Sequence, residues 1–103
     1  MPKEMPERRV EEDVGDGRYA VELAESARRD LKKVSPQVKE EILAAIEELA
    51  DEPRPRGCKK VRGADAYRIR LGSYRVIYQI FDVHLVVIVV RMGHRREVYR
   101  GFG

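Results

Sequence analysis

The chain has 103 residues, 43% hydrophobic and 38% charged, which is typical of one small globular domain and excludes a second lobe that could form a cleft. Its single cysteine, Cys58, excludes an internal disulfide and a cysteine-rich zinc site, and no apolar run is long enough to span a membrane, so we expect a cytoplasmic protein without a membrane partner. The net charge of +3 combines 9 basic and 15 acidic residues in 1–53, a balance of −6, with 12 basic and 3 acidic residues in 54–103, a balance of +9. The strong positive charge of the second half favours a polyanionic partner, and nucleic acid is the first candidate.

Residues 1–17 alternate charged residues with Pro and Gly and show no apolar period. We therefore expect a disordered or loosely ordered N-terminal extension before a single domain at residues 18–103. Residues 18–23 alternate apolar and polar side chains, which predicts a first β-strand. A first helix is predicted next, because apolar residues recur at the spacing of one helical face: Ala27, Leu31 and Val34.

A second helix is predicted to begin at Ser35 and Pro36, with the serine as N-cap and the proline at the first helical position. Its buried stripe consists of five apolar residues at helical spacing: Val38, Ile42, Ala45, Ile46 and Leu49. The helix is expected to end before Pro53, where a loop rich in Pro and Gly begins. The short connection between the two helices predicts an antiparallel pair.

Three β-strands are predicted in the second half, at residues 67–71, 74–81 and 84–91, with turns at Gly72-Ser73 and Asp82-Val83. No internal repeat interrupts this order. The order β-α-α-β-β-β predicts an α+β fold, in which a small and mostly antiparallel sheet carries the helix pair on one face.

A two-residue turn at Gly72-Ser73 would place Arg70 opposite Arg75 in the hairpin. The face expected under the helices then holds seven side chains: Tyr67, Ile69, Leu71, Tyr74, Val76, Tyr78 and Ile80. The other face holds Arg68, Arg70 and Arg75. Like charges that face each other in a sheet destabilise it by roughly 0.2–1 kcal/mol, so this patch indicates an anion-binding surface. The alternative is three solvated arginines on a one-sided sheet.

Two further basic groups are candidates for contact with a nucleic acid. The loop before the hairpin holds Arg54, Arg56, Lys59, Lys60 and Arg62, for which plain solvation is an equal alternative. The end of the chain holds His94, Arg95, Arg96, Tyr99 and Arg100. The positive charge of these arginines would favour the phenolate form of Tyr99, and its ring could also stack on a nucleobase. The alternative is that Tyr99 only anchors the end of the chain on the sheet. Two histidines ten residues apart do not make a metal site, so neither a metal nor another cofactor is expected.

These stretches resemble the RelE/ParE superfamily of toxins from type II toxin–antitoxin pairs: YRIRLGSYRVIYQI, an apolar strand and MGHRREVYR, preceded by the helix pair and KKVRG. The resemblance covers roughly residues 18–100, and the RelE branch fits better than the ParE branch. RelE-type toxins are ribosome-dependent endoribonucleases, which cut the mRNA codon in the ribosomal A site without a metal and are neutralised by a cognate antitoxin. The resemblance therefore implies a RelE-like fold, with the ribosome, its mRNA and a RelB-like antitoxin as partners.

The resemblance also implies five catalytic residues, which are Arg68 and Arg70 on the first hairpin strand, Arg75 at the start of the second, Arg95 after the glycine, and Tyr99. In the family, the ribose 2′-OH attacks the adjacent phosphate. Arg70 and Arg75 would stabilise the developing charge, Arg68 would orient the backbone, and Arg95 would act as acid or stabiliser. The best-known members have lysines at the first two positions, and arginine cannot release its proton there. The base is therefore expected to be Tyr99, with His94 as a substitute, although the segment between Arg95 and Tyr99 is shorter than in those members.

Two alternatives stay open at this point. A ParE-like toxin shares the fold but poisons DNA gyrase, and it would need a protein-binding surface instead of the arginine–tyrosine set. A non-catalytic nucleic-acid-binding module, or a toxin that has lost its activity, would keep the charge but not cut RNA.

Overall fold

The computed structural model describes residues 18–94, and the predicted extension at 1–17 and the C-terminal residues 95–103 lie outside that range. In chain order the elements are β1 (Ala20–Leu23), α2 (Glu25–Lys32), α3 (Pro36–Glu48), β2 (Lys59–Lys60), β3 (Tyr67–Leu71), β4 (Tyr74–Phe81) and β5 (Val86–His94). The predicted α+β fold is confirmed, with one short strand, β2, in a segment that was predicted to be a loop.

Both helices form where the apolar spacing predicts them. Ala27 of α2 and Ile42 and Ile46 of α3 are buried, and Pro36 occupies the first turn of α3. Ser35 is the N-cap with extended backbone, but its hydroxyl makes no capping hydrogen bond. Among the described residues, no helix is long and apolar enough to cross a membrane.

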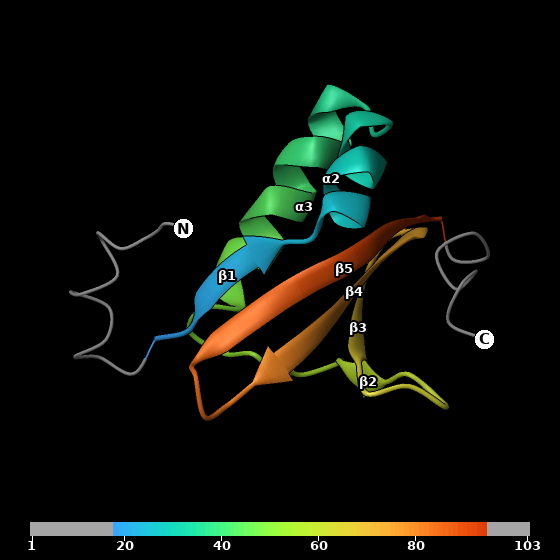
Figure 1. The fold of residues 1–103 in the computed structure, drawn as a ribbon. Helices are drawn as coiled ribbons and strands as arrows, with labels where there is room; N and C mark the ends of the chain where they lie inside the picture. The colour runs from blue at the N-terminus through green and yellow to red at the C-terminus, as the bar shows by residue number, and fades with distance from the viewer. Residues whose placement is uncertain (1–17, 95–103) are drawn as a thin grey trace.

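The five strands form one sheet in the order β1-β5-β4-β3-β2. β1 runs parallel to β5, with Ala20 opposite Val86, and every other neighbouring pair is antiparallel. Within residues 18–94, the first strand thus lies beside the last one. Figure 1 shows α2 and α3 together on one face of this sheet, with β2 and β3 at the edge away from β1.

The main core lies between the helices and the sheet face that the alternation predicts. Ile69, Val76 and Tyr78 are buried there against the helices, and the other predicted members of that face pack around them. A smaller cluster lies apart from this core and consists of Val61, Ala66 and Ile77, with Ala64 and Val90 packed against it. The sequence did not predict this second cluster, in which residues of the β2–β3 connection shield Ile77.

β5 is displaced from the predicted strand at 84–91. Residues 82–85 form a four-residue turn in place of the predicted two-residue turn, and Leu85 adopts a positive φ of 55°. Along the strand, Ile77 of β4 pairs with Arg91 whereas Tyr78 pairs with Val89. Val90 is therefore an extra residue, and β5 carries a β-bulge at this point.

The bulge reverses which residues of β5 face the helices. Val87 and Val89 are buried in the main core before it, and Met92 is buried in that core after it. Strict alternation without an extra residue would turn Met92 outward and Gly93 toward the helices. Because of the bulge, Gly93 instead lies opposite Arg75 on the outer face of the sheet.

Candidate functional site

The outer face of the sheet, turned away from the helices, carries a row of basic side chains. Lys59 pairs with Arg68, and Arg70 pairs with Arg75, which confirms the predicted hairpin register. Residues opposite each other in a sheet point to the same side, and so do residues two apart on one strand. We call the resulting set of four residues the basic face: Lys59, Arg68, Arg70 and Arg75. Lys59 joins it because β2 is a strand and not the predicted loop.

Arg75 is much less exposed than a solvated arginine on an outer sheet face would be. It is 8% exposed, whereas Arg70 is exposed and Arg68 is half-buried. Charged groups are rarely buried in proteins, because moving them out of water is costly. The alternative of three solvated arginines therefore does not describe Arg75.

Gly93 lies beside Arg75 in the register and keeps that part of the outer face open. Its φ of 154° lies in a region that other residues rarely adopt, and a Cβ placed on it would meet no atom within 4 Å. The glycine is thus required by its backbone conformation and not by crowding. As a consequence, no side chain from β5 projects next to Arg75 at this position.

His94 lies apart from the basic face. It pairs with Tyr74, whose face is the one packed against the core, and the two rings are 4.5 Å apart between centroids. His94 therefore belongs to the helix side of the sheet at its rim. The role of His94 as a substitute base stays a prediction.

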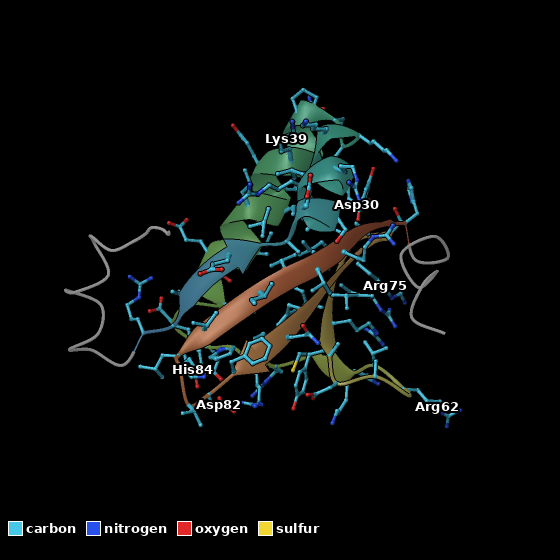
Figure 2. The ribbon with its side chains drawn as sticks, in the orientation of Figure 1. Asp30, Lys39, Arg62, Arg75, Asp82 and His84 are labelled. Carbon is cyan, nitrogen blue, oxygen red and sulfur yellow. The ribbon has the colours of Figure 1, made fainter. Side chains whose placement is uncertain are left out.

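Arg54, predicted as an RNA contact, lies at the other end of the sheet in an ion pair with Asp82. Its two terminal nitrogens donate to both carboxylate oxygens, at 3.2 and 2.9 Å, and the Tyr19 hydroxyl donates to the same carboxylate at 2.6 Å. The pairing raises the pKa of Arg54, and it holds the pKa of the Asp82 carboxyl below its ordinary value. Figure 2 shows Asp82 far from Arg75.

Two tyrosines continue this network into the core. The Arg54 guanidinium lies 5.3 Å from the ring centroid of Tyr67, which stacks on Tyr78 at 6.1 Å. The buried Tyr78 hydroxyl donates to the carbonyl of Pro53 at 2.7 Å, and burial raises the pKa of this phenol. These contacts hold the loop after α3 against the sheet, so Arg54 has a structural role whether or not it also contacts RNA.

The other predicted RNA contacts are dispersed, and their role stays a prediction. Lys60 pairs with Tyr67 and so points away from the basic face, while Arg56 is exposed in the loop after α3. Figure 2 shows Arg62 in the β2–β3 connection, well apart from Arg75. Four predicted residues lie outside the described range: Arg95, Arg96, Tyr99 and Arg100. Within residues 18–94, no group of three His, Cys, Asp or Glu side chains could hold a metal ion.

Asp30 is a residue near the site that the sequence did not single out. It lies on α2, and one of its carboxylate oxygens accepts hydrogen bonds from the side chain of Arg91 at 2.8 Å and from the backbone N–H of Met92 at 2.9 Å. One turn earlier on the same helix, the Ser26 hydroxyl donates to the carbonyl of Val90 at 2.6 Å. The signal in the sequence is weak, since it amounts to two polar residues spaced four apart beside the apolar stripe.

Comparison with known proteins identifies similar toxins. The profile of the family described as ParE toxin of type II toxin-antitoxin system, parDE, matches residues 21–99. The chain is 39% identical over 89 residues to toxin RelG of Mycobacterium tuberculosis, a match that covers 80% of this chain and 97% of RelG. It is 35% identical over 86 residues to the mRNA interferase toxin RelE of Escherichia coli, covering 79% of this chain and 90% of that toxin.

Solved structures of similar sequence share the fold. The RelBE2 toxin–antitoxin complex of Mycobacterium tuberculosis contains a chain that matches with a TM-score of 0.69 at 34% identity, covering 76% of this chain and 99% of that one. The archaeal RelE–RelB complex of Pyrococcus horikoshii gives a TM-score of 0.67 at 28% identity, covering 76% and 96%. The two helices and mixed sheet are therefore the architecture of these toxins.

Proposed function

The chain belongs to the RelE/ParE superfamily of type II toxins, within its RelE-like branch, and from this we propose that it is an endoribonuclease that cuts messenger RNA in the A site of the ribosome. The observation that carries the proposal is Arg75, a buried arginine between Arg70 and the glycine position of β5 on the outer face. A site for an RNA phosphate needs fixed positive charge, and a buried guanidinium is fixed by its surroundings. Such preorganised charge stabilises a developing oxyanion without reorganisation during the reaction.

The proposed roles follow from what each side chain can do chemically. The 2′-OH of the ribose attacks the adjacent phosphorus, its proton passes to a base, and the 5′-oxygen leaves with a proton from an acid. Arg70 and Arg75 stabilise the extra charge on the phosphate oxygens, while Arg68 holds the RNA backbone. Arginine stays protonated and cannot serve as the base. We therefore assign the base to Tyr99 and the role of a further charge stabiliser to Arg95, as the sequence resemblance implies, with water as the source of the proton for the 5′-oxygen.

The proposed partners are the ribosome with its A-site mRNA and a RelB-like antitoxin, and we propose the cytoplasm as the site of action because ribosomes translate mRNA there. The similar chains from Mycobacterium tuberculosis and Pyrococcus horikoshii were solved in toxin–antitoxin complexes. An antitoxin that neutralises this chain has to cover its positive surface or distort it. Two experiments would test this partner. A small acidic protein encoded by a neighbouring gene should co-purify with this chain, and mixing the two proteins should abolish mRNA cleavage.

Cleavage on purified ribosomes programmed with a defined mRNA tests the activity. The wild-type protein should cut within the A-site codon and leave a cyclic phosphate or its hydrolysis product. Arg75→Ala should lower the single-turnover rate by on the order of 10²–10³-fold, the usual effect of removing one such stabiliser. Tyr99→Phe should also lower it. Arg28→Ala is the matched control, because it removes one exposed arginine from α2 and should leave the rate unchanged. Cleavage by Arg75→Ala and Tyr99→Phe at the wild-type rate would refute the proposed roles.

A gyrase poison is the second candidate, since the matching family profile carries the ParE name. Induction in bacteria separates the two activities. Translation arrest with cuts at codon positions supports the endoribonuclease, whereas DNA damage of the gyrase type with intact mRNA supports the second candidate. Ribosome binding without cleavage or toxicity would indicate a non-catalytic module.

A further inference from the structure

The distal half of β5 lacks a strand neighbour on one side. β1 pairs with β5 only as far as Leu23 and Val89, and the next backbone contact is the N–H of Ala24 with the carbonyl of Val89 at 2.8 Å. Beyond that point, no strand among residues 18–94 flanks β5 on the side of β1. Unpaired backbone groups at such an edge need other partners.

Side chains of α2 supply these partners at the bulge. The Ser26 hydroxyl donates to the carbonyl of Val90, which is the extra residue of the bulge, and Asp30 accepts from the N–H of Met92. Ser26 and Asp30 are four residues apart and lie on one face of the helix. In effect, one helix face replaces the missing strand over the stretch that leads to Gly93.

Asp30 makes more of these contacts than a neutral residue could. Its Oδ2 accepts from both the Arg91 Nε at 2.8 Å and the Met92 N–H at 2.9 Å, while its Oδ1 lies 3.4 Å from a terminal nitrogen of Arg91. The Asp30 side chain is 11% exposed and that of Arg91 is 29% exposed. An asparagine would keep one oxygen for the Met92 N–H but would turn a second donor toward Arg91.

We propose that Asp30 is a positioning residue of the RNA-cleaving face: it fixes the bulged end of β5, so that Gly93 stays opposite Arg75. This proposal rests on the proposed function for its consequence in catalysis. The physical reason is the register, because a slip of one residue after Val90 would exchange the two faces of β5. Gly93 would then turn toward the helices, and a side chain would enter the outer face beside Arg75.

Four variants test the proposal: Asp30→Asn, Asp30→Ala, Arg91→Ala and Asp51→Ala. The last is the matched control, because Asp51 also pairs with an arginine, Arg18, at 2.8 Å, but on the surface and with 67% of its side chain exposed. Each variant is assayed at a temperature well below its thermal unfolding midpoint. Two quantities are measured: the single-turnover cleavage rate at saturating ribosome concentration, and the ribosome concentration that gives half of that rate. Amide hydrogen exchange of Met92 is measured in parallel, relative to that of Val87 in the paired half of β5.

Asp30→Ala should lower the saturating cleavage rate by on the order of 10²-fold, the usual cost of misplacing a reacting group by about 1 Å. The half-saturating ribosome concentration should change little. Asp30→Asn should fall between Asp30→Ala and the wild type, since it keeps one acceptor for Met92, and Arg91→Ala should be milder than Asp30→Ala for the same reason. Asp51→Ala should match the wild type. Met92 should lose its protection in Asp30→Ala while Val87 keeps its own, which a general loss of stability would not produce.

A cleavage rate of folded Asp30→Ala equal to that of the wild type, or Met92 protection that falls only together with Val87, would overturn the proposal. If the wild-type protein does not cut mRNA, the proposed function is wrong, but the structural role of Asp30 can still be tested. The Met92 exchange and the NMR signals of Gly93 and the Arg75 Nε–H then decide the positioning claim by themselves. Selective shifts of these signals in Asp30→Ala support it, and unchanged signals refute it.

Discussion

The hydroxyl of Tyr78 offers a direct test of how this small domain holds its loop after α3. Tyr78 lies in the middle of β4 with 0% exposure, and its hydroxyl donates to the carbonyl of Pro53 at 2.7 Å. Tyr78→Phe keeps the ring, its burial and its stacking on Tyr67. The substitution therefore removes the hydroxyl, with its hydrogen bond to Pro53 and its interaction with the Cys58 thiol, and keeps the apolar packing of the ring.

The expected loss can be worked from the contact. Removing one partner of a buried hydrogen bond costs about 1–3 kcal/mol, because the remaining group stays buried without it. For a domain of this size, each kcal/mol corresponds to roughly 4–8 °C in the unfolding midpoint. Tyr67→Phe is the matched control, because it removes the same hydroxyl from the neighbouring ring. That hydroxyl makes one long contact, 3.4 Å from the Arg54 Nε, at an exposed position. Its removal should change the free energy of unfolding by less than about 0.5 kcal/mol.

Urea unfolding followed by circular dichroism measures both variants. The Tyr78→Phe midpoint should fall with an unchanged slope, and the Tyr67→Phe midpoint should stay near that of the wild type. Equal losses in the two variants would refute the reasoning, because burial is what distinguishes the two hydroxyls.

Three further predictions concern the basic face and the ion pair at the far end of the sheet. Arg70→Thr should raise the free energy of unfolding by roughly 0.2–1 kcal/mol at low salt, since it removes one of two facing like charges, and should slow mRNA cleavage. Urea titrations at two salt concentrations and single-turnover assays check this, and a stability gain with undiminished cleavage would contradict a functional Arg70–Arg75 pair. Arg54 holds the pKa of Asp82 below its ordinary value of 3.8, so this carboxylate contributes stability above that pH and loses it as the pH falls through the lowered pKa. The difference in urea midpoint between wild type and Asp82→Asn should therefore shrink under strongly acidic conditions, and a difference independent of pH would count against the pairing. Gly93→Ala should destabilise the fold by about 1–3 kcal/mol through backbone strain alone, and a thermal midpoint equal to that of the wild type would rule out the positive φ.

The charge pattern of the chain separates its two layers in space. The acidic first half supplies both helices, with exposed glutamates on α3 at Glu40, Glu41, Glu47 and Glu48. The basic second half supplies β2, β3 and β4, which carry the basic face. An RNA that approaches the molecule is therefore attracted to the basic face of the sheet and repelled by the acidic surface of α3. Orientation on the ribosome would then follow from the fold before any specific contact forms.

The sequence alone determined the features that depend on neighbours along the chain. The stripes of α2 and α3 follow from apolar spacing within one helix, and the pairing of Arg70 with Arg75 follows from a two-residue turn between alternating strands. Both patterns are local, because each requires only a periodicity of two or 3.6 residues. The resemblance to RelE-type toxins rests on the same local stretches.

The tertiary structure decided the features that join distant segments. The run LVVIVV is apolar at every position, so it has no alternation from which a register or a bulge could be predicted, and packing between β1, β4 and the helices sets both. That bulge places His94 on the helix side and Gly93 beside Arg75. The partners of Arg54 and Arg91 lie 28 and 61 residues away, a separation that no sequence period records. The arginines could be found from the sequence, but which of them is buried, which is paired and which lies on the outer face depended on the folded sheet.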